Sequence, residues 1–194
     1  MPSRVDIKEK RRVLDDFFKV EEAHLSFERF DGTMSPLVRR LNFERGDSVA
    51  AMLHHTGRGT ALLVNQFKYP SYEKGPGWIT EVVAGMIDKG ETPEEAIKRE
   101  IHEETGYKAD RVEHISTFYL SPGGSSERIM LYYAAVSGAG PSDECAGLAS
   151  ENEDIKLIEI PVADAFGQLR RGEIADAKTI IALMWLEARH GARS

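Results

Sequence analysis

The chain has 194 residues and a formal net charge of −7, with 41% hydrophobic and 29% charged residues. This composition can form a buried core and excludes a disordered chain, and the length favours one domain with an appendage. The acidic balance and the lack of a Lys/Arg-rich block argue against nucleic acid as the main partner.

The cysteine count and the hydropathy pattern indicate where such a chain would work. Cys145 is the only cysteine, which excludes an intrachain disulfide framework and a thiolate metal cluster. No run of about 18 apolar residues occurs, so no membrane-spanning helix is predicted. The first thirty residues lack the apolar core of a signal peptide. We therefore expect a soluble, cytoplasmic protein.

The N-terminal region contains short alternating runs but few apolar residues for its length. Residues 20–30 (VEEAHLSFERF) alternate, Asp31-Gly32 supplies a turn, and residues 37–45 (LVRRLNFER) follow. The pattern predicts a hairpin or small antiparallel sheet. Its apolar face is expected to pack against the following domain or another subunit.

The hydropathy pattern changes at Ser48, where longer apolar runs begin. Residues 48–55 (SVAAMLHH) and 60–67 (TALLVNQF) are two apolar strands around a Gly-containing turn. Residues 69–78 (YPSYEKGPGW) are rich in Pro and Gly and indicate a loop. Residues 78–87 (WITEVVAGMI) are strand-like, and the strand is expected to end at Gly85.

Residues 92–106 carry the clearest helix signals in the chain. Thr92 is a good N-cap, Pro93 suits the first helical position, and Glu95 completes a capping box. Gly106 is expected to end the helix. These local signals predict a helix over residues 93–105.

The later elements complete the expected architecture. Residues 112–120 and 127–136 are strands that flank the loop SPGGSS, and residues 137–154 form a long acidic loop. A strand at 156–162 and amphipathic helices at 163–174 and 176–191 follow. Strands on both sides of a central helix, with two late helices, predict an α+β fold with a mixed sheet between helices.

Three carboxylates gather on one side of the predicted central helix. Glu100, Glu103 and Glu104 span an arc of about 100° at 3.6 residues per turn. Ile97 and Ile101 border this arc, whereas a solvated face usually lies opposite the apolar stripe. Repulsion at i,i+4 and the helix dipole both oppose such a cluster. The two explanations are an ordinary solvated acidic face and a site completed by a cation.

Magnesium suits the second explanation. It takes hard oxygen ligands and is typically held by a few carboxylates plus substrate phosphates. Arg99 lies one turn before Glu103, so an i,i+4 ion pair could fix one of the carboxylates.

The spacing of the residues around this helix resembles a known pattern. Gly85 is followed by Glu91, and then by residues 99–107, REIHEETGY. This sequence resembles the box of the Nudix hydrolases: glycine, glutamate, then arginine-glutamate-apolar-x-glutamate-glutamate-x-glycine-apolar. Only Tyr107 departs from it, being aromatic at a structural position where an aliphatic residue is usual.

The resemblance implies a Nudix fold, with a mixed sheet between helices (α/β/α) and a strand–loop–helix element that binds divalent metals and a diphosphate. The ligands it implies are Glu100, Glu103, Glu104 and the backbone carbonyl of Ala84. The metal would be Mg²⁺, with Mn²⁺ possible, at two or three ions per site, and water would attack phosphorus. Glu91 is expected to close the loop structurally.

Segments outside the box also look like one branch of this family. Residues 34–50, NQFKYP, WITEVVAGMID, LSPGGSSER and GLASENEDI resemble the ADP-ribose pyrophosphatases, and GDP-mannose hydrolases share several of them. Pro122 lies sixteen residues past Gly106, a spacing that in this branch favours ADP-ribose. The resemblance therefore implies hydrolysis of ADP-ribose to AMP and ribose 5-phosphate.

The acidic loop has two interpretations. By composition it is a flexible surface loop, but the box glutamates are occupied by metal, so water activation needs another carboxylate. In similar enzymes such a loop supplies the catalytic glutamate. The match GLASENEDI places it at Glu151, with Glu153 as a further metal or water contact. The catalytic group expected from the resemblance is thus Glu151, Glu153 and Glu104.

The substrate contacts that the resemblance implies are spread along the chain. For Arg40 and Arg45 the alternative is surface charge, and for Phe17 and Phe18 it is core packing. Lys68 stands where the branch often has arginine, so it keeps the charge but loses the bidentate fork. The full set is Phe17, Phe18, Arg40, Arg45, Lys68, Met86, Ser121, Pro122, Gly123 and Glu127.

In similar enzymes the N-terminal strands exchange between two subunits of a C2 dimer, so that each site contains residues of both chains. We therefore expect residues 1–47 to be a dimerising strand region and residues 48–194 to be the Nudix hydrolase domain. Two other functions stay open. One is hydrolysis of GDP-mannose or another nucleotide sugar, and the other is a Nudix module that senses a nucleotide without cleaving it.

Overall fold

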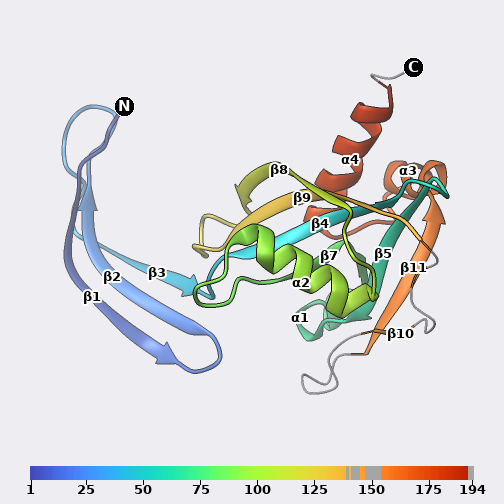
Figure 1. The fold of residues 1–194 in the computed structure, drawn as a ribbon. Helices are drawn as coiled ribbons and strands as arrows, with labels where there is room; N and C mark the ends of the chain where they lie inside the picture. The colour runs from blue at the N-terminus through green and yellow to red at the C-terminus, as the bar shows by residue number, and fades with distance from the viewer. Residues whose placement is uncertain (139, 141–144, 147–153, 192–194) are drawn as a thin grey trace. The chain divides into compact units, whose positions relative to one another are not determined.

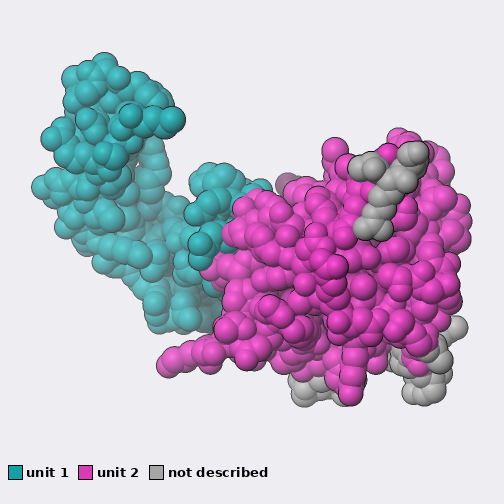
Figure 2. All heavy atoms as spheres, turned by 45° about the horizontal axis from the view of Figure 1, so that its top comes forward, with its two compact units in different colours: residues 1–46, 119–128 teal, residues 47–118, 129–194 magenta. Residues whose placement is uncertain are grey.

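The computed structural model describes residues 1–138, 140, 145–146 and 154–191. Two compact units divide the chain: residues 1–46 with 119–128, and residues 47–118 with 129–194 (Figure 2). The loop that precedes β9 (Arg128–Val136) therefore belongs to the same unit as the N-terminal strands.

The first unit contains the small antiparallel sheet expected from the N-terminal sequence. Its strands are β1 (Val5–Asp15), β2 (Lys19–Phe27) and β3 (Val38–Glu44), in the order β1-β2-β3. The two alternating runs recognised in the sequence are β2 and β3, and β1 adds a third strand. Every side chain of β1 is exposed.

The second unit is built on a mixed sheet (Figure 1). Strand β4 pairs in parallel with β9 but antiparallel with β5 and β7. The sheet order is β10-β11-β5-β4-β9-β8, with β6 on β5 and β7 on β4. The strands not yet bounded are β4 (Ser48–His55), β5 (Thr60–Phe67), β6 (Trp78–Glu81), β7 (Val83–Met86), β8 (Arg111–Tyr119), β10 (Cys145–Ala146) and β11 (Ile155–Pro161).

Helices cover both faces of this sheet (Figure 1). They are α2 (Pro93–Thr105) on one face, α3 (Val162–Arg170) and α4 (Ala177–Gly191) on the other, with the short α1 (Tyr69–Tyr72) after β5. Within β4, Val49 and Leu53 pack with Ile97 of α2, whereas Met52 packs in the second cluster with Leu183 of α4. Because both faces are covered, β4 is apolar without alternation. The predicted α/β/α arrangement is confirmed.

The acidic loop predicted at residues 137–154 contains the short strand β10, and two further predictions, between residues 69 and 87, also differ from the structure. The loop expected from residue 69 begins with the helix α1, where Pro70 stands in the first turn, a position that proline tolerates. The single strand expected at 78–87 is two strands, β6 and β7, on different partners. They divide at Val82, whose N–H donates to the Thr179 hydroxyl at 2.8 Å and not to a neighbouring strand.

No helix in the described part of the chain is long and apolar enough to cross a membrane.

Candidate metal and diphosphate site

Both ends of α2, the helix that carries the glutamates, are fixed as the sequence predicts. Thr92 Oγ1 accepts from the Glu95 N–H at 3.3 Å, and Glu95 Oε2 accepts from the Thr92 N–H at 2.9 Å. Gly106 ends the helix at φ 68°, and its N–H donates to His102 O at 2.8 Å. The reciprocal capping box and the left-handed cap set which residues face the sheet.

Glu104 is buried against strand β7. The residue is only 3% exposed, and its Oε2 accepts from the Ala84 N–H at 3.4 Å. The structure thus brings together two of the predicted ligands, Glu104 and the backbone of Ala84. A buried carboxylate in such a place requires a compensating charge or hydrogen bonds.

Glu100 lies against the next residue of the same strand. A Cβ atom built on Gly85 would lie 1.9 Å from the carboxyl carbon of Glu100, a distance that no real contact reaches. Gly85 is therefore needed for the space that its missing side chain leaves, and its φ is not positive. The glycine that opens the box makes room for the first glutamate of the helix.

Arg99 connects the loop to the carboxylates of the helix. Its Nε and Nη2 donate to the two oxygens of Glu91 at 3.0 Å each, and its Nη1 donates to Glu100 at 2.8 Å and Glu103 at 2.9 Å. Its Nη2 also donates to Met86 O at 3.0 Å. The expected Arg99–Glu103 pair is present, and Glu91 closes the loop as expected.

These contacts shift the pKa values of Arg99 and Glu91. The hydrogen bonds with Glu91, and then those with Glu103 and Glu100, raise the pKa of Arg99 further above its ordinary value. The Arg99 guanidinium in turn lowers the pKa of Glu91. Both groups are therefore charged at neutral pH, and the guanidinium offsets part of the repulsion among the glutamates.

The donor set fits a divalent metal, although the described residues do not form a preformed cluster. Among the described residues, no three His, Cys, Asp or Glu side chains converge on one point. Glu100 and Glu103 share one nitrogen of Arg99, so a cation would have to compete with it. The side chains of Glu100 and Glu103 are 13% and 27% exposed. All the candidate ligands are hard oxygen donors, which magnesium and manganese prefer.

A hollow of about 560 Å³ lies within the first unit. Arg40 and Asn42 of β3 line it together with the loop that contains Pro122 and Gly123. The loop is held to β3 because the Phe43 N–H donates to Gly124 O at 2.8 Å and Asn42 Nδ2 donates to Ser126 Oγ at 3.1 Å. Three of the predicted substrate residues, Arg40, Pro122 and Gly123, therefore border one cavity.

A second group of predicted residues meets nearby in the same unit. The Arg45 guanidinium lies 5.7 Å from the centre of the Phe18 ring, and its Nε lies 3.6 Å from Glu127 Oε1. The Phe17 and Phe18 ring centres are 4.7 Å apart, and Phe17 is 81% exposed. Phe17 is therefore not a core residue within this chain. Ser121 O accepts from the N–H groups of Gly124 and Ser125 at 3.0 Å each and shapes the loop.

Lys68 forms an ion pair with Glu81, a residue that was not among the predicted site residues. Its Nζ lies 3.4 Å from Oε1 of Glu81, and Lys178 Nζ donates to Oε2 of Glu81 at 2.9 Å. Burial alone would lower the pKa of Lys178, but Glu81 and Asp176 outweigh it and raise that pKa. Glu81 lies inside an apolar run and Lys178 at the start of an amphipathic helix, so neither carried a sequence signal.

The predicted residues thus divide between the two units. The second unit holds Lys68, Ala84, Met86, Glu100, Glu103 and Glu104, and the first unit holds Phe17, Phe18, Arg40, Arg45, Ser121, Pro122, Gly123 and Glu127. Glu151 and Glu153 lie outside the described residues.

In this α/β/α fold a capped helix presents glutamates to a glycine-containing strand, and such carboxylates are the hard oxygen donors that a divalent metal prefers. The chain belongs to the NUDIX domain family, whose sequence pattern matches residues 44–183. It is a Nudix hydrolase, as the spacing of the box predicted. Nudix hydrolases generally use divalent metal ions.

Known relatives are similar over nearly the whole chain. The GDP-mannose pyrophosphatase of Pectobacterium atrosepticum is 35% identical over 185 residues, 94% of each chain. The ADP-ribose pyrophosphatase of Escherichia coli is 34% identical over 97% of this chain and 90% of its own. A crystal structure of an ADP compounds hydrolase matches with a TM-score of 0.71 at 16% identity, covering 99% of this chain and 97% of that one. At that identity the last match supports the fold alone.

Proposed function

We propose that this protein hydrolyses the diphosphate of ADP-ribose with water, giving AMP and ribose 5-phosphate, in a reaction that depends on Mg²⁺. The observation that carries the proposal is the placement of Glu100 and Glu104 against Gly85 and Ala84. The choice of ADP-ribose as the substrate is based on the similarity to the ADP-ribose pyrophosphatase of Escherichia coli.

The metal ligands in this proposal are Glu100, Glu103, Glu104 and the carbonyl of Ala84, for two or three Mg²⁺ ions, with Mn²⁺ as a substitute. Bound ions of this kind polarise a phosphoryl oxygen and lower the pKa of bound water. Arg99 orients Glu100 and Glu103 from one side, since both accept from its Nη1. Glu91 keeps that guanidinium in place.

Substrate binding is assigned to the residues around the hollow and the aromatic pair. Arg40 supplies a cation, Pro122 shapes the pocket, and Gly123 lets the substrate approach the backbone closely because it has no side chain. Phe17 and Phe18 offer stacking surfaces for the base, with Arg45 and Glu127 beside them. Lys68 and Met86 extend the contacts in the second unit, and Ser121 shapes the loop.

Proton transfer is assigned to the acidic segment beyond β9. Glu151 would act as the general base that takes the proton of the attacking water, with Glu153 as a further metal or water contact. The box glutamates are committed to metal, so a separate carboxylate suits this role.

GDP-mannose is the second candidate substrate. The relative from Pectobacterium atrosepticum is named for it and is as similar as the ADP-ribose enzymes. Lys68 also departs from the arginine expected for the ADP-ribose branch. A module that senses a nucleotide without cleaving it is less well supported, because every glutamate of the box is present.

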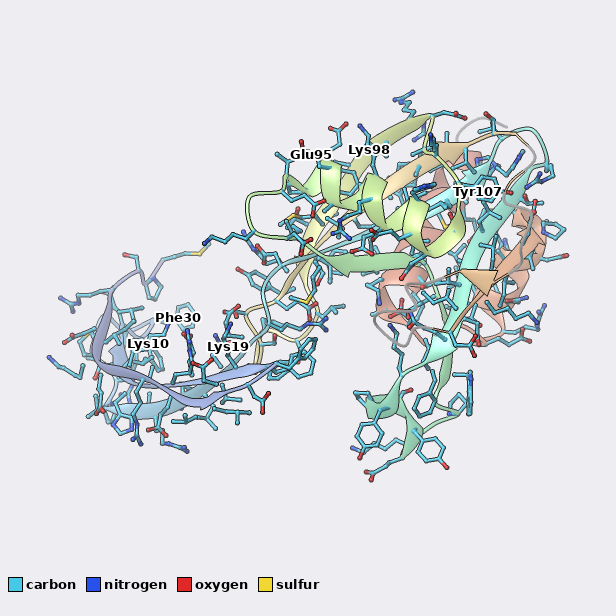
Figure 3. The ribbon with its side chains drawn as sticks, turned by 60° about the horizontal axis from the view of Figure 1, so that its bottom comes forward. Lys10, Lys19, Phe30, Glu95, Lys98 and Tyr107 are labelled. Atoms are coloured by element: carbon cyan, nitrogen blue, oxygen red, sulfur yellow. The ribbon has the colours of Figure 1, made fainter. Side chains whose placement is uncertain are left out.

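A homodimer with exchanged N-terminal strands accompanies this proposal. Several large apolar side chains of the first unit are exposed within one chain, and a second copy would cover them. They include Val5, Ile7, Leu14, Phe17 and Phe30. Phe30 is labelled in Figure 3. We also place the enzyme in the cytoplasm, where its single cysteine would remain a free thiol.

The activity is tested by incubating the protein with a panel of nucleoside diphosphate sugars and Mg²⁺ in ¹⁸O-water. Mass spectrometry then identifies the products and the phosphate that carries the label. AMP and ribose 5-phosphate from ADP-ribose, at a higher kcat/KM than for GDP-mannose, is the expected result. Preferential cleavage of GDP-mannose would favour the second candidate, and binding without cleavage would favour the sensor.

The shared site is tested by mixing two inactive variants. Arg40→Ala and Glu104→Gln should restore activity when they are refolded together, because one of the two sites in a mixed dimer is then intact. No recovery would show that each site is built within one chain.

A further inference from the structure

One guanidinium joins four segments of the second unit at the C-terminal end of α2. Arg58, in the turn between β4 and β5, donates through Nε and Nη2 to the two oxygens of Glu159, at 2.5 and 3.0 Å. Its Nη1 donates to Gly138 O at 3.2 Å, beyond the end of β9. Its Nη2 also donates to the Tyr107 hydroxyl at 2.5 Å.

Tyr107 connects this network to α2. It follows Gly106, the residue that ends the helix, and is labelled in Figure 3. Its ring is buried in the cluster that contains Ile97 and Ile101. Its N–H donates to Thr105 Oγ1 at 3.2 Å, and that hydroxyl donates to Ile101 O. Tyr107 therefore connects the last turn of α2, through its backbone N–H, to the guanidinium of Arg58, through its hydroxyl.

Neighbouring groups fit closely around this network. His55 is 4% exposed, and its Nε2 lies 2.9 Å from Gly138 O, the same carbonyl that accepts from Arg58. Gly140 has φ +80°, and a Cβ atom there would lie 2.3 Å from the Tyr107 oxygen. The backbone at this point requires glycine because the tyrosine hydroxyl occupies the space.

The tyrosine is the one residue that departs from the box pattern, which has an aliphatic side chain at this position. An aliphatic residue would fill the same buried volume but would leave Arg58 Nη2 without this acceptor. The hydroxyl therefore has a use beyond packing.

We propose that Arg58 and Tyr107 are positioning residues of the hydrolase, which set the C-terminal end of α2, with Glu103 and Glu104, against the strands β9 and β11. The proposal rests on the proposed function only in assigning metal binding to Glu103 and Glu104. Both act by fixing the helix end that carries two of the proposed ligands.

Tyr107→Phe is the sharpest test, since it removes the hydroxyl and keeps the buried ring. The metal-free protein is titrated with Mn²⁺ by calorimetry, and amide hydrogen exchange is followed at residues 102–107. Loss of one hydrogen bond of this kind should weaken Mn²⁺ binding about 5-fold. Exchange at the helix end should accelerate, and kcat for ADP-ribose should fall while KM stays unchanged.

Arg58→Lys tests the other half of the pair. A lysine keeps the charge but cannot reach Glu159, Tyr107 and Gly138 together. The expected effects match those of Tyr107→Phe, and the double variant should be no worse than the more affected single variant, because both changes break one network. Arg171→Lys is the control, since it alters an exposed bidentate pair with Glu173. It should leave Mn²⁺ binding, exchange and kcat unchanged.

The outcomes separate this proposal from the proposed function. If Tyr107→Phe lowers the melting temperature but leaves Mn²⁺ binding and exchange at 102–107 unchanged, the pair only stabilises the fold and the proposal is wrong. If the wild-type protein binds Mn²⁺ but cleaves no nucleotide sugar, the proposed function fails and the positioning role can still be measured. A wild-type protein that binds no Mn²⁺ overturns both.

Discussion

The carboxylate of Glu100 occupies the space that a side chain at Gly85 would need. The Cβ atom of an alanine there would lie 1.9 Å from the carboxyl carbon and 1.9 Å from one of its oxygens. A side chain at residue 85 and the Glu100 carboxylate therefore exclude one another, and glycine lets the carboxylate lie directly against strand β7.

Gly85→Ala should displace the Glu100 carboxylate and weaken metal binding. Each misplaced ligand or supporting contact typically costs about 10- to 100-fold in metal affinity, and we expect a loss of that size in an Mn²⁺ titration. Gly191→Ala is the control, since a Cβ atom there meets nothing within 4 Å. Wild-type Mn²⁺ affinity in Gly85→Ala would show that Glu100 is not a ligand.

Arg99→Lys should reduce both stability and turnover, because lysine cannot reproduce the fork that holds Glu91 while contacting Glu100 and Glu103. We expect a loss of about 1–2 kcal/mol in the free energy of unfolding, measured with urea. Lys98→Ala breaks the exposed pair with Glu94 on the same helix and should change stability by less than about 0.5 kcal/mol. Equal effects of the two substitutions would contradict the role given to Arg99.

Thr92→Ala should destabilise the protein without changing its chemistry. The threonine side chain caps α2 and lies far along the helix from Glu103, so the expected cost is about 0.5–2 kcal/mol in unfolding free energy. Urea unfolding measures the loss, and KM for ADP-ribose should stay the same. A large change in KM, measured under conditions in which the variant is fully folded, would mean that the cap also positions residues that bind the substrate.

Glu151→Gln should lower kcat by about 10²- to 10⁴-fold with little change in substrate affinity, as for the loss of a general base. Steady-state kinetics and a binding measurement with the same substrate provide the two numbers. Glu153→Gln is the matched comparison in the same segment. If it is the more damaging change, the base is assigned to the wrong glutamate.

The sheet of the first unit should lose stability in acid through Glu22. Hydrogen bonds from Arg11 and then from Arg39 lower the pKa of Glu22 below its ordinary value of 4.5. Because the folded-state pKa is the lower one, the contribution is present above about pH 4.5 and is lost as the pH falls through the folded-state value.

Melting temperatures of the wild-type protein and Glu22→Gln, measured from about pH 7 to about pH 3, test this behaviour. The gap between the two curves should be largest at neutral pH and should close in acid. A gap that does not change with pH would show that the charge of Glu22 contributes nothing to stability.

The signals that succeeded in the sequence are local. Thr92, Pro93, Glu95 and Gly106 define α2 within fifteen residues, and the structure places the helix at Pro93–Thr105. The family follows from spacing within one segment, from Gly85 to Gly106, because the strand, loop and helix that hold the ligands are contiguous in the chain.

The features that were missed depend on residues far apart in the chain. The division of β6 from β7 follows from the hydroxyl of Thr179, 97 positions from Val82. The contact of Lys178 with Glu81 similarly joins α4 to β6, and Lys68 reaches the same carboxylate from the residue after β5. Neither partner alone shows a pattern, since a hydrogen bond between distant residues leaves no periodicity in either segment.

The sequence by itself determined the helix α2 with its caps and the family, because each depends on propensity or spacing within a short stretch. It also determined the α/β/α class, through the order of its elements and the resemblance to that family. Only the tertiary structure decided that Gly85 makes room for Glu100, that Arg99 shares its nitrogens among three glutamates, and that Tyr107 bonds to Arg58. The reason is physical: these contacts depend on the packing of a helix on a sheet, which fixes distances that the order of residues does not contain.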